Sequence, residues 1–463
     1  MGQSTVDSRQ STVRRGAITF VGALALLAAP GALRVALAQE AAAEVVTLEQ
    51  AVAMALQNSA SILSAEAQVG RSENELAAAR TKRLPSVEVQ GMASQLLTQP
   101  SVSFPAGAFG SYPATGPIPS TDTIIKAKTA PTAWVNATIA QPLTQLHKAG
   151  LGVKANQLTR DADRQQLRAQ RAAVAYDVRR LYYAVLQSQS ASAAAREQVK
   201  ALRELDQDVV RYVSLESSLP QDEMDVKARL AAQEYQIVAI DNTVATYKEQ
   251  LNMLFGRDPR TPFETTSAAA GEIEAVDLEA ARTRALAARP ELEKARLQVE
   301  LADTQRRLKK AEFIPDVSVA VSYNSFFNVD LLPQSIAQLG LQVKWEPFDW
   351  GRRSKELAAK TLAVDQARYA ARDQKNQVLA EVDRAFRQVQ EARALVAARR
   401  LGGDHAQEQL RVALLRRREH SVLVRDVLQA QATMADARAK LDEAELSLWL
   451  ARAELDKAMG EDK

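Results

Sequence analysis

The chain has 463 residues, of which 46% are hydrophobic, 25% charged and only 5% aromatic. That length exceeds one ordinary compact domain, and the composition excludes a wholly disordered chain. The 59 basic and 56 acidic residues nearly cancel, which gives no support to a nucleic-acid partner. Cysteine is absent and the three histidines (His147, His405 and His420) are far apart in sequence, so neither a disulfide nor a metal or cofactor site is expected.

Residues 1–38 have the three parts of a secretory signal peptide. A polar segment ends at Arg15, an apolar run extends from position 17 to 29, and small residues precede a cleavage site after Ala38. An N-terminal anchor helix is the alternative, but the run is shorter than the roughly 20 residues that span a bilayer. No later segment is long and apolar enough for a membrane helix, so we expect any membrane crossing to be made by strands.

Residues 47–83 carry apolar side chains at helical spacing, with Thr47 as the N-cap and Pro85 as the stop. After Pro85 the period changes from 3.6 to 2, and apolar residues alternate with polar ones over 86–95 and again over 132–141. Strands of this length, with one apolar and one polar face, are typical of an outer-membrane barrel. Half-buried strands of a soluble sheet are the alternative interpretation.

Residues 96–131 join these two strands and are rich in proline, glycine, serine and threonine. We expect a surface loop on the external side, with a disordered tip as the alternative. Residues 148–215 and 222–255 then form a helical hairpin whose turn contains Ser217, Ser218, Leu219 and Pro220. A helix of more than sixty residues extends roughly 100 Å and is stable only when it is paired along its length.

The second half of the chain repeats this order of elements. Positions 46–51 recur as 276–281, a shift of 230 residues, and the match continues to the two strand-entry prolines. The sequence predicts a helix over 277–312 capped by Asp277, strands at 316–325 and 338–346, and helices over 352–417 and 422–459. The turn of this second hairpin carries Arg416, Arg417, Arg418 and Glu419.

The predicted organisation is therefore a first repeat at 39–255, a linker at 256–276, a second repeat at 277–460 and a short tail at 461–463. Each repeat supplies two strands, and four strands cannot close a barrel around water. An open sheet in lipid leaves backbone groups unpaired at its edges. If the strands span a membrane, several chains must combine them, and three chains give the smallest ring with a usable lumen.

Several motifs, taken in order, make the chain resemble the TolC-like outer membrane efflux protein family. They are the duplicated Leu-Glu-x-Ala opening, Arg289-Pro290-Glu291-Leu292, Phe313-x-Pro315, the strand exit from Trp345 to Arg353, and Asp426-Val427-Leu428-Gln429-Ala430-Gln431. The first-repeat exit, Gln141-Pro142-Leu143, keeps only the start of the family motif.

This resemblance implies a mainly α fold with β strands, in which a homotrimer forms a twelve-stranded outer-membrane barrel continued by a periplasmic helical tunnel. It implies a passive exit duct of a tripartite efflux or type I secretion system, docked onto a periplasmic adaptor and an inner-membrane pump. Small molecules, metal ions and polypeptides are all compatible with a water-filled duct.

The resemblance also places candidate site residues. Asp426 and Asp225 lie where family members have pore-narrowing aspartates, although Gln429 departs from a position that is acidic in some relatives. The alternative is that both are solvated carboxylates near helix starts. The residues of the two hairpin turns are candidate adaptor contacts or simply solvated charges.

The aromatic residues and the strand exit allow further expectations. Trp134, Trp345 and Trp350 fit either an interfacial aromatic girdle or packing at the junction of barrel and tunnel. Asp349 is expected to be the N-cap of the following helix. No catalytic motif is found, so an enzyme is not expected, and the remaining alternative is a soluble periplasmic coiled-coil scaffold.

Overall fold

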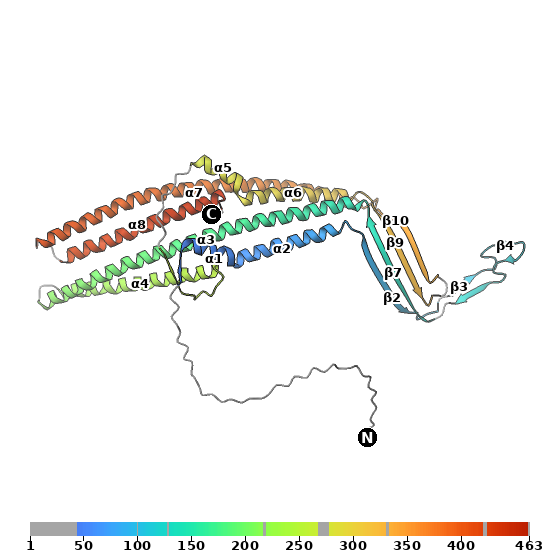
Figure 1. The fold of residues 1–463 in the computed structure, drawn as a ribbon, viewed down its shortest axis with the longest axis horizontal. Helices are drawn as coiled ribbons and strands as arrows, with labels where there is room; N and C mark the ends of the chain where they lie inside the picture. The colour runs from blue at the N-terminus through green and yellow to red at the C-terminus, as the bar shows by residue number, and fades with distance from the viewer. Residues whose placement is uncertain are drawn as a thin grey trace, which may run out of the picture. The chain divides into compact units, whose positions relative to one another are not determined.

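The computed structural model describes residues 44–99, 101–126, 129–215, 219–266, 277–329, 333–419 and 424–461 (Figure 1). Within Glu44–Lys463, the described residues form one compact unit. The predicted signal peptide with its cleavage site at Ala38 lies outside the described residues, as do Ser217 and Ser218. The prediction of a mainly α fold with β strands is confirmed.

The first helix of each repeat is broken in two, which corrects the single helices expected over 47–83 and 277–312. The first becomes α1 (Leu48–Asn58) and α2 (Ala60–Thr81), and the second becomes α5 (Leu278–Ala288) and α6 (Pro290–Ala311). Ser59 and Arg289 separate the pairs with extended backbones, at ψ 126° and 120°. Pro290 explains the second break, because a proline disfavours helical backbone in the residue before it.

Four long helices form two hairpins, α3 (Gln145–Ser214) with α4 (Pro220–Leu254) and α7 (Arg352–Arg418) with α8 (Val424–Met459). Helix α3 is central, because it packs against α2, α4, α6 and α8, while α7 packs against α5, α6 and α8 (Figure 1). In the described part of the chain, no helix has the length and apolar character needed to cross a membrane.

Two buried clusters hold the helices together, and their residues on the hairpins are related by a shift of 204 residues. The first is centred on Val178, Tyr182 and Val185 of α3, and the second on Val382 and Val389 of α7. The ion pairs across the hairpins keep the same shift, since Arg196–Asp241 (3.1 Å) corresponds to Arg400–Glu445 (3.5 Å). Positions 251–256 and 455–460 also differ by 204. The two hairpins therefore correspond to each other with a shift of 204 residues. The shift before the strands is 230 residues, and it falls to 204 because the loop between the strands is shorter in the second repeat.

The four long strands form one antiparallel sheet in the order β10-β9-β7-β2. They are β2 (Ser86–Gln95), β7 (Pro131–Pro142), β9 (Asp316–Phe327) and β10 (Ser335–Lys344), and each is continuous with one of α2, α3, α6 and α7 (Figure 1). The loop 96–131 has strands of its own, with β3 (Ser101–Phe104) paired to β6 (Thr123–Lys126) and β4 (Ser111–Tyr112) to β5 (Gly116–Pro117).

The linker between the repeats contributes a strand to the helical part. Strand β8 (Phe263–Thr265) pairs in parallel with β1 (Glu44–Val46). The Tyr182 hydroxyl hydrogen-bonds the carbonyl oxygens of Val46 and Thr266 at 2.9 and 2.8 Å. These bonds fix the two-stranded sheet against α3.

A glycine ends each hairpin against the first helix of its own repeat. Gly256 has φ 68°, and a Cβ there would lie 2.5 Å from the Asn58 carbonyl oxygen. Gly460 has φ 79°, and a Cβ there would lie 3.0 Å from the backbone of Ala288 and Arg289. The left-handed backbone and the close approach both require a residue without a side chain.

We predict that Gly256→Ala destabilises the protein by about 2–3 kcal/mol, because it adds a steric clash to backbone strain. Gly116→Ala is the matched control, since Gly116 has φ 71° but open space around its Cβ position. Thermal unfolding of the purified variants measures the difference. Equal melting temperatures for the two variants would contradict the proposed close packing on α1.

Candidate functional site: a two-faced sheet and two hairpin turns

One face of the sheet is apolar and exposed. The strand register places Val87, Ile139, Val321 and Leu339 in one row across all four strands. Val87 and Leu339, on the two outer strands, are 70% and 74% exposed. Such a continuous apolar surface is unusual on a soluble monomer and indicates contact with an apolar partner or with lipid.

The opposite face is polar and more enclosed. Asn136 donates to the Asn324 side-chain oxygen at 2.6 Å, and the Thr138 hydroxyl donates to the Asn136 oxygen at 2.9 Å. Asn136, Thr138, Ser322 and Asn324 are half-buried on this face. On the apolar face, the residues at the centre of the row, Ile139 and Val321, remain 49% and 46% exposed.

Both outer edges of the sheet lack a partner strand within the described residues. Strand β2 pairs only with β7, and β10 pairs only with β9. Strand β10 runs antiparallel to β9, which runs antiparallel to β7, which runs antiparallel to β2, so β2 and β10 run in opposite directions. An antiparallel ladder between the edges of two copies is therefore geometrically allowed.

The second-repeat strand exit is fixed by a capping carboxylate. The N-cap of α7 is Gly351, with φ 83°, and not Asp349 as expected. Asp349 nevertheless accepts hydrogen bonds from the backbone N–H groups of Arg353 (3.0 Å) and Gly351 (3.1 Å). The hydrogen bond from the Arg353 N–H lowers the pKa of Asp349, and the hydrogen bond from the Gly351 N–H adds a smaller lowering. Arg353 also contacts Glu346 at 2.6 Å, so the Glu-Pro-Phe-Asp-Trp-Gly-Arg-Arg motif closes on itself.

The first-repeat exit uses different contacts, which explains why it lacks this motif. The Thr144 hydroxyl donates to the Pro315 carbonyl oxygen and accepts from the Val317 N–H, both at 2.8 Å. Lys148 pairs with Asp316 at 2.5 Å. The exit of the first repeat is thus bonded to the strand entry of the second.

Arg289, from the Arg-Pro-Glu-Leu motif, connects several helices. Its side chain is 7% exposed and contacts Glu381 of α7 at 2.5 Å and Glu291 of α6 at 3.1 Å. It also donates to the Lys457 carbonyl oxygen near the end of α8. The motif therefore joins the α5–α6 break to the second hairpin.

The hairpin turns lie at the ends of the hairpins away from the sheet (Figure 1). Helix α4 begins at Pro220, and Asp222 accepts from the Leu219 N–H at 3.1 Å. Asp225 pairs with Arg229 at 2.8 Å and is exposed. The sequence analysis did not identify Asp222, although the shift of 204 residues relates it to Asp426.

The second turn begins where α7 ends. Arg416, Arg417 and Glu419 are exposed, and Arg418 is the last residue of α7. Asp426 is exposed in the first turn of α8. The shift of 204 pairs Asp426 with Asp222 rather than with Asp225, whose counterpart is Gln429.

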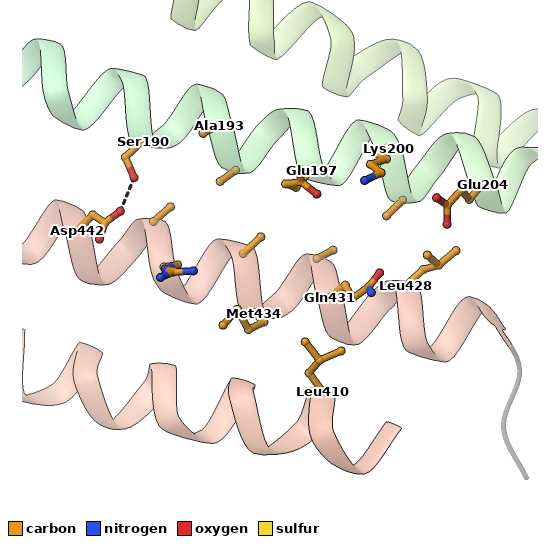
Figure 2. A pocket seen from close by; sticks show the side chains of 16 residues that line it. Ser190, Ala193, Glu197, Lys200, Glu204, Leu410, Leu428, Gln431, Met434 and Asp442 are labelled. Carbon is orange, nitrogen blue, oxygen red and sulfur yellow. Dashed lines mark hydrogen bonds between the residues drawn. The ribbon is translucent and has the colours of Figure 1, made fainter. Parts of the chain in front are cut away.

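A groove runs between α3 and α8, where the two hairpins meet (Figure 2). Its volume is about 570 Å³, and small side chains such as Ala193 and Ala435 line much of it. Glu197, Lys200 and Arg438 add charge. At one end the Ser190 hydroxyl donates to Asp442 at 2.7 Å, a bond between the hairpins (Figure 2).

Residues 270–461 match the family model described as "Outer membrane efflux protein". This sequence match covers the predicted second repeat, about two fifths of the chain. No curated protein matches the chain in sequence.

Solved structures extend the fold match to both repeats. The CmeC outer membrane channel of Campylobacter jejuni has a TM-score of 0.75 at 13% identity, over 90% of this chain and 86% of that one. VceC, an outer membrane protein of Vibrio cholerae, has a TM-score of 0.67 at 17% identity, over 89% and 96%. The open MtrE outer membrane channel of Neisseria gonorrhoeae has a TM-score of 0.69 at 14% identity, over 89% and 88%. At these identities the likeness shows a shared fold.

The ends of α4 and α8 differ in one buried polar residue. Asn252 donates to the carbonyl oxygens of Pro259 and Thr261 at 2.8 and 2.9 Å. Its repeat counterpart is Asp456, which lies 2.9 Å from Arg452. Burial raises the pKa of Asp456 despite this arginine.

We predict that Asp456→Asn stabilises the protein at pH 7. A carboxyl whose pKa is higher in the folded state loses stability as the pH rises from about 4 through that folded pKa, because the buried charge is disfavoured. The asparagine removes this loss, so its advantage in melting temperature should disappear as the pH falls toward about 4. The reciprocal variant Asn252→Asp should be destabilised at pH 7. A pH-independent difference for Asp456→Asn would contradict the explanation.

Proposed function

We propose that three copies of this chain form a passive outer-membrane exit duct. The observation that carries the proposal is the sheet with one apolar face, one polar face and two unpaired edges of opposite direction. In hydrocarbon every backbone N–H and C=O needs a partner, so such a sheet is stable only when it closes. Three copies of four strands make a twelve-stranded barrel, with lipid against the apolar face and water against the polar face.

The two halves of the chain form one duplicated unit in this proposal. Residues 39–255 are the first repeat, 256–276 the linker and 277–460 the second repeat. The support comes from the shifts of 230 and 204 residues and from the glycines that end both hairpins against their own first helices. Residues 1–38 act as the export signal, cleaved after Ala38.

The helical part continues the barrel into the periplasm and meets the partners that supply energy. A periplasmic adaptor and an inner-membrane pump are the partners of the proposed assembly. The adaptor contacts are the turn residues Ser217, Ser218, Leu219 and Pro220 of the first hairpin and Arg416, Arg417, Arg418 and Glu419 of the second. Leu219 is 65% exposed, which supports its availability to a partner.

Aspartates near the turns narrow the periplasmic entrance. Asp426 and Asp225 are the proposed residues, and the repeat register adds Asp222. In a trimer each of them forms a ring of three carboxylates, and such rings favour cations in a pore. Gln429 gives the second hairpin one carboxylate fewer than the first at these positions.

Replacing Leu339 with arginine tests which face of the sheet meets lipid. We expect Leu339→Arg to impair outer-membrane assembly, because a basic residue on the lipid face costs about 2–4 kcal/mol at the bilayer midplane. Gln338→Arg, on the adjacent position of β10 and the opposite face, should assemble normally. The readout is the amount of trimer extracted from outer membranes by detergent. A soluble wild-type monomer would favour the scaffold alternative instead.

Removing the carboxylates tests the entrance. Asp426→Ala and Asp222→Ala should each weaken cation block and raise the conductance of single channels in planar bilayers, because each removes three charges per trimer. Gln429→Ala is the matched control and should behave as the wild type. A variant that combines Asp426→Ala with Asp222→Ala but keeps the wild-type conductance and cation block would contradict the proposal that these carboxylates narrow the entrance.

A further inference from the structure

The polar face of the sheet carries one row of large apolar side chains near its loop end. We propose that this row, Met92, Trp134 and Phe326, forms an apolar constriction inside the duct that selects cargo with apolar surface over hydrated ions. The inference rests on the proposed trimeric barrel, and it adds a selective element to it.

The strand register defines the row. Met92 is the partner of Trp134 in the β2–β7 ladder, and Trp134 is the partner of Phe326 in the β7–β9 ladder. Directly opposed residues of antiparallel strands project from the same face, with Cβ atoms about 4.5–5.5 Å apart. The three side chains are therefore neighbours on one face.

That face is the polar one. Two residues away along the strands, the same side carries Gln90, Asn136 and Asn324, and the last two are joined by a hydrogen bond. Side chains two positions apart on a strand share a face. Trp134 thus lies on the opposite face of the sheet from the apolar row.

The row is bounded by polar residues on its other side as well. The next row toward the loops contains Ser94 and Thr132, whose hydroxyl oxygens are 3.1 Å apart. Apart from Ile336, the partner of Asn324 on β10, the rows on either side of this apolar band are polar. Apolar surface exposed to water is unfavourable by about 25 cal/mol per Å², so this band is not explained by solubility.

Closure of the barrel converts the band into a ring. Twelve strands spaced about 4.8 Å apart and tilted by about 40° give a barrel roughly 24 Å across its backbone. Three copies place nine large apolar side chains around this lumen, in three short rows inclined to the barrel axis. Apolar constrictions hinder ions by dewetting, whereas they offer contact to amphipathic or apolar molecules.

The test uses single-channel recordings of the full-length trimer in planar bilayers with potassium chloride. We expect the double variant Trp134→Gln with Phe326→Gln to raise potassium conductance about twofold or more, because it replaces two apolar rings with polar side chains and so removes the apolar barrier. Trp134→Phe should keep the wild-type conductance. Val135→Thr, one residue away on the lipid-facing side, is the matched control and should also leave conductance unchanged.

The outcomes separate this inference from the proposed function. If the wild-type protein forms channels and the glutamine double variant has the same conductance, the constriction is wrong and the proposed duct still stands. A raised conductance in Val135→Thr equal to that of the double variant would overturn it too, since the effect would not depend on the face. A wild-type protein that forms no channel would overturn the duct and the constriction together.

Discussion

The structure depends on one constraint, the need of every backbone hydrogen-bonding group in an apolar medium to find a partner. The sheet satisfies this need internally at β7 and β9 but not at the outer edges of β2 and β10. Exposing its apolar face to water is unfavourable. Exposing its unpaired edges to lipid is also unfavourable for a single chain. In the proposed duct, assembly of copies through these edges resolves both conflicts, and the channel is the consequence of that assembly.

The arrangement of the four strands continues into the helical part of the chain. Each of the four long strands is continuous with a helix, and α3 packs against five other helices. Buried valines occupy the same repeat positions of α3 and α7 and pack the two helices into corresponding clusters. Polar contacts fix the few places where the pattern changes, such as Arg289 at the α5–α6 break and Thr144 at the first strand exit.

Periodicity and duplication made most of the fold predictable from the sequence. Alternation after Pro85 and Pro315 indicated the strands, and long proline-free segments indicated the helices. The break at Ser59 was not predictable in this way, because no proline or glycine marks it and the extended backbone depends on packing. Strand β8 was also missed, since its three residues are held by pairing with β1, a contact between distant parts of the chain.

The candidate site was predictable to a similar extent. The motifs pointed to Asp426 and to the strand exit, where Asp349 caps α7 from two residues before its N-cap. The role of Asp222 required the register of the hairpins, which the longer first loop obscures. Alternation within β7 already puts Trp134 on the same face as Asn136, but its neighbours Met92 and Phe326 required the strand pairing, because counting residues through a long loop does not give the register.

The most direct test of the shared barrel is a disulfide cross-link between the sheet edges of neighbouring copies, which the absence of native cysteine makes possible. One cysteine is placed on β2 at Val87 or Val89 and another on β10 at Leu339 or Leu341, so that four pairs sample the register between copies. A shared barrel predicts that oxidation of outer membranes yields a covalent trimer for at least one pair, while cysteines at Ile139 and Val321 of the central strands yield only monomers. Monomers for all four edge pairs would contradict the shared barrel.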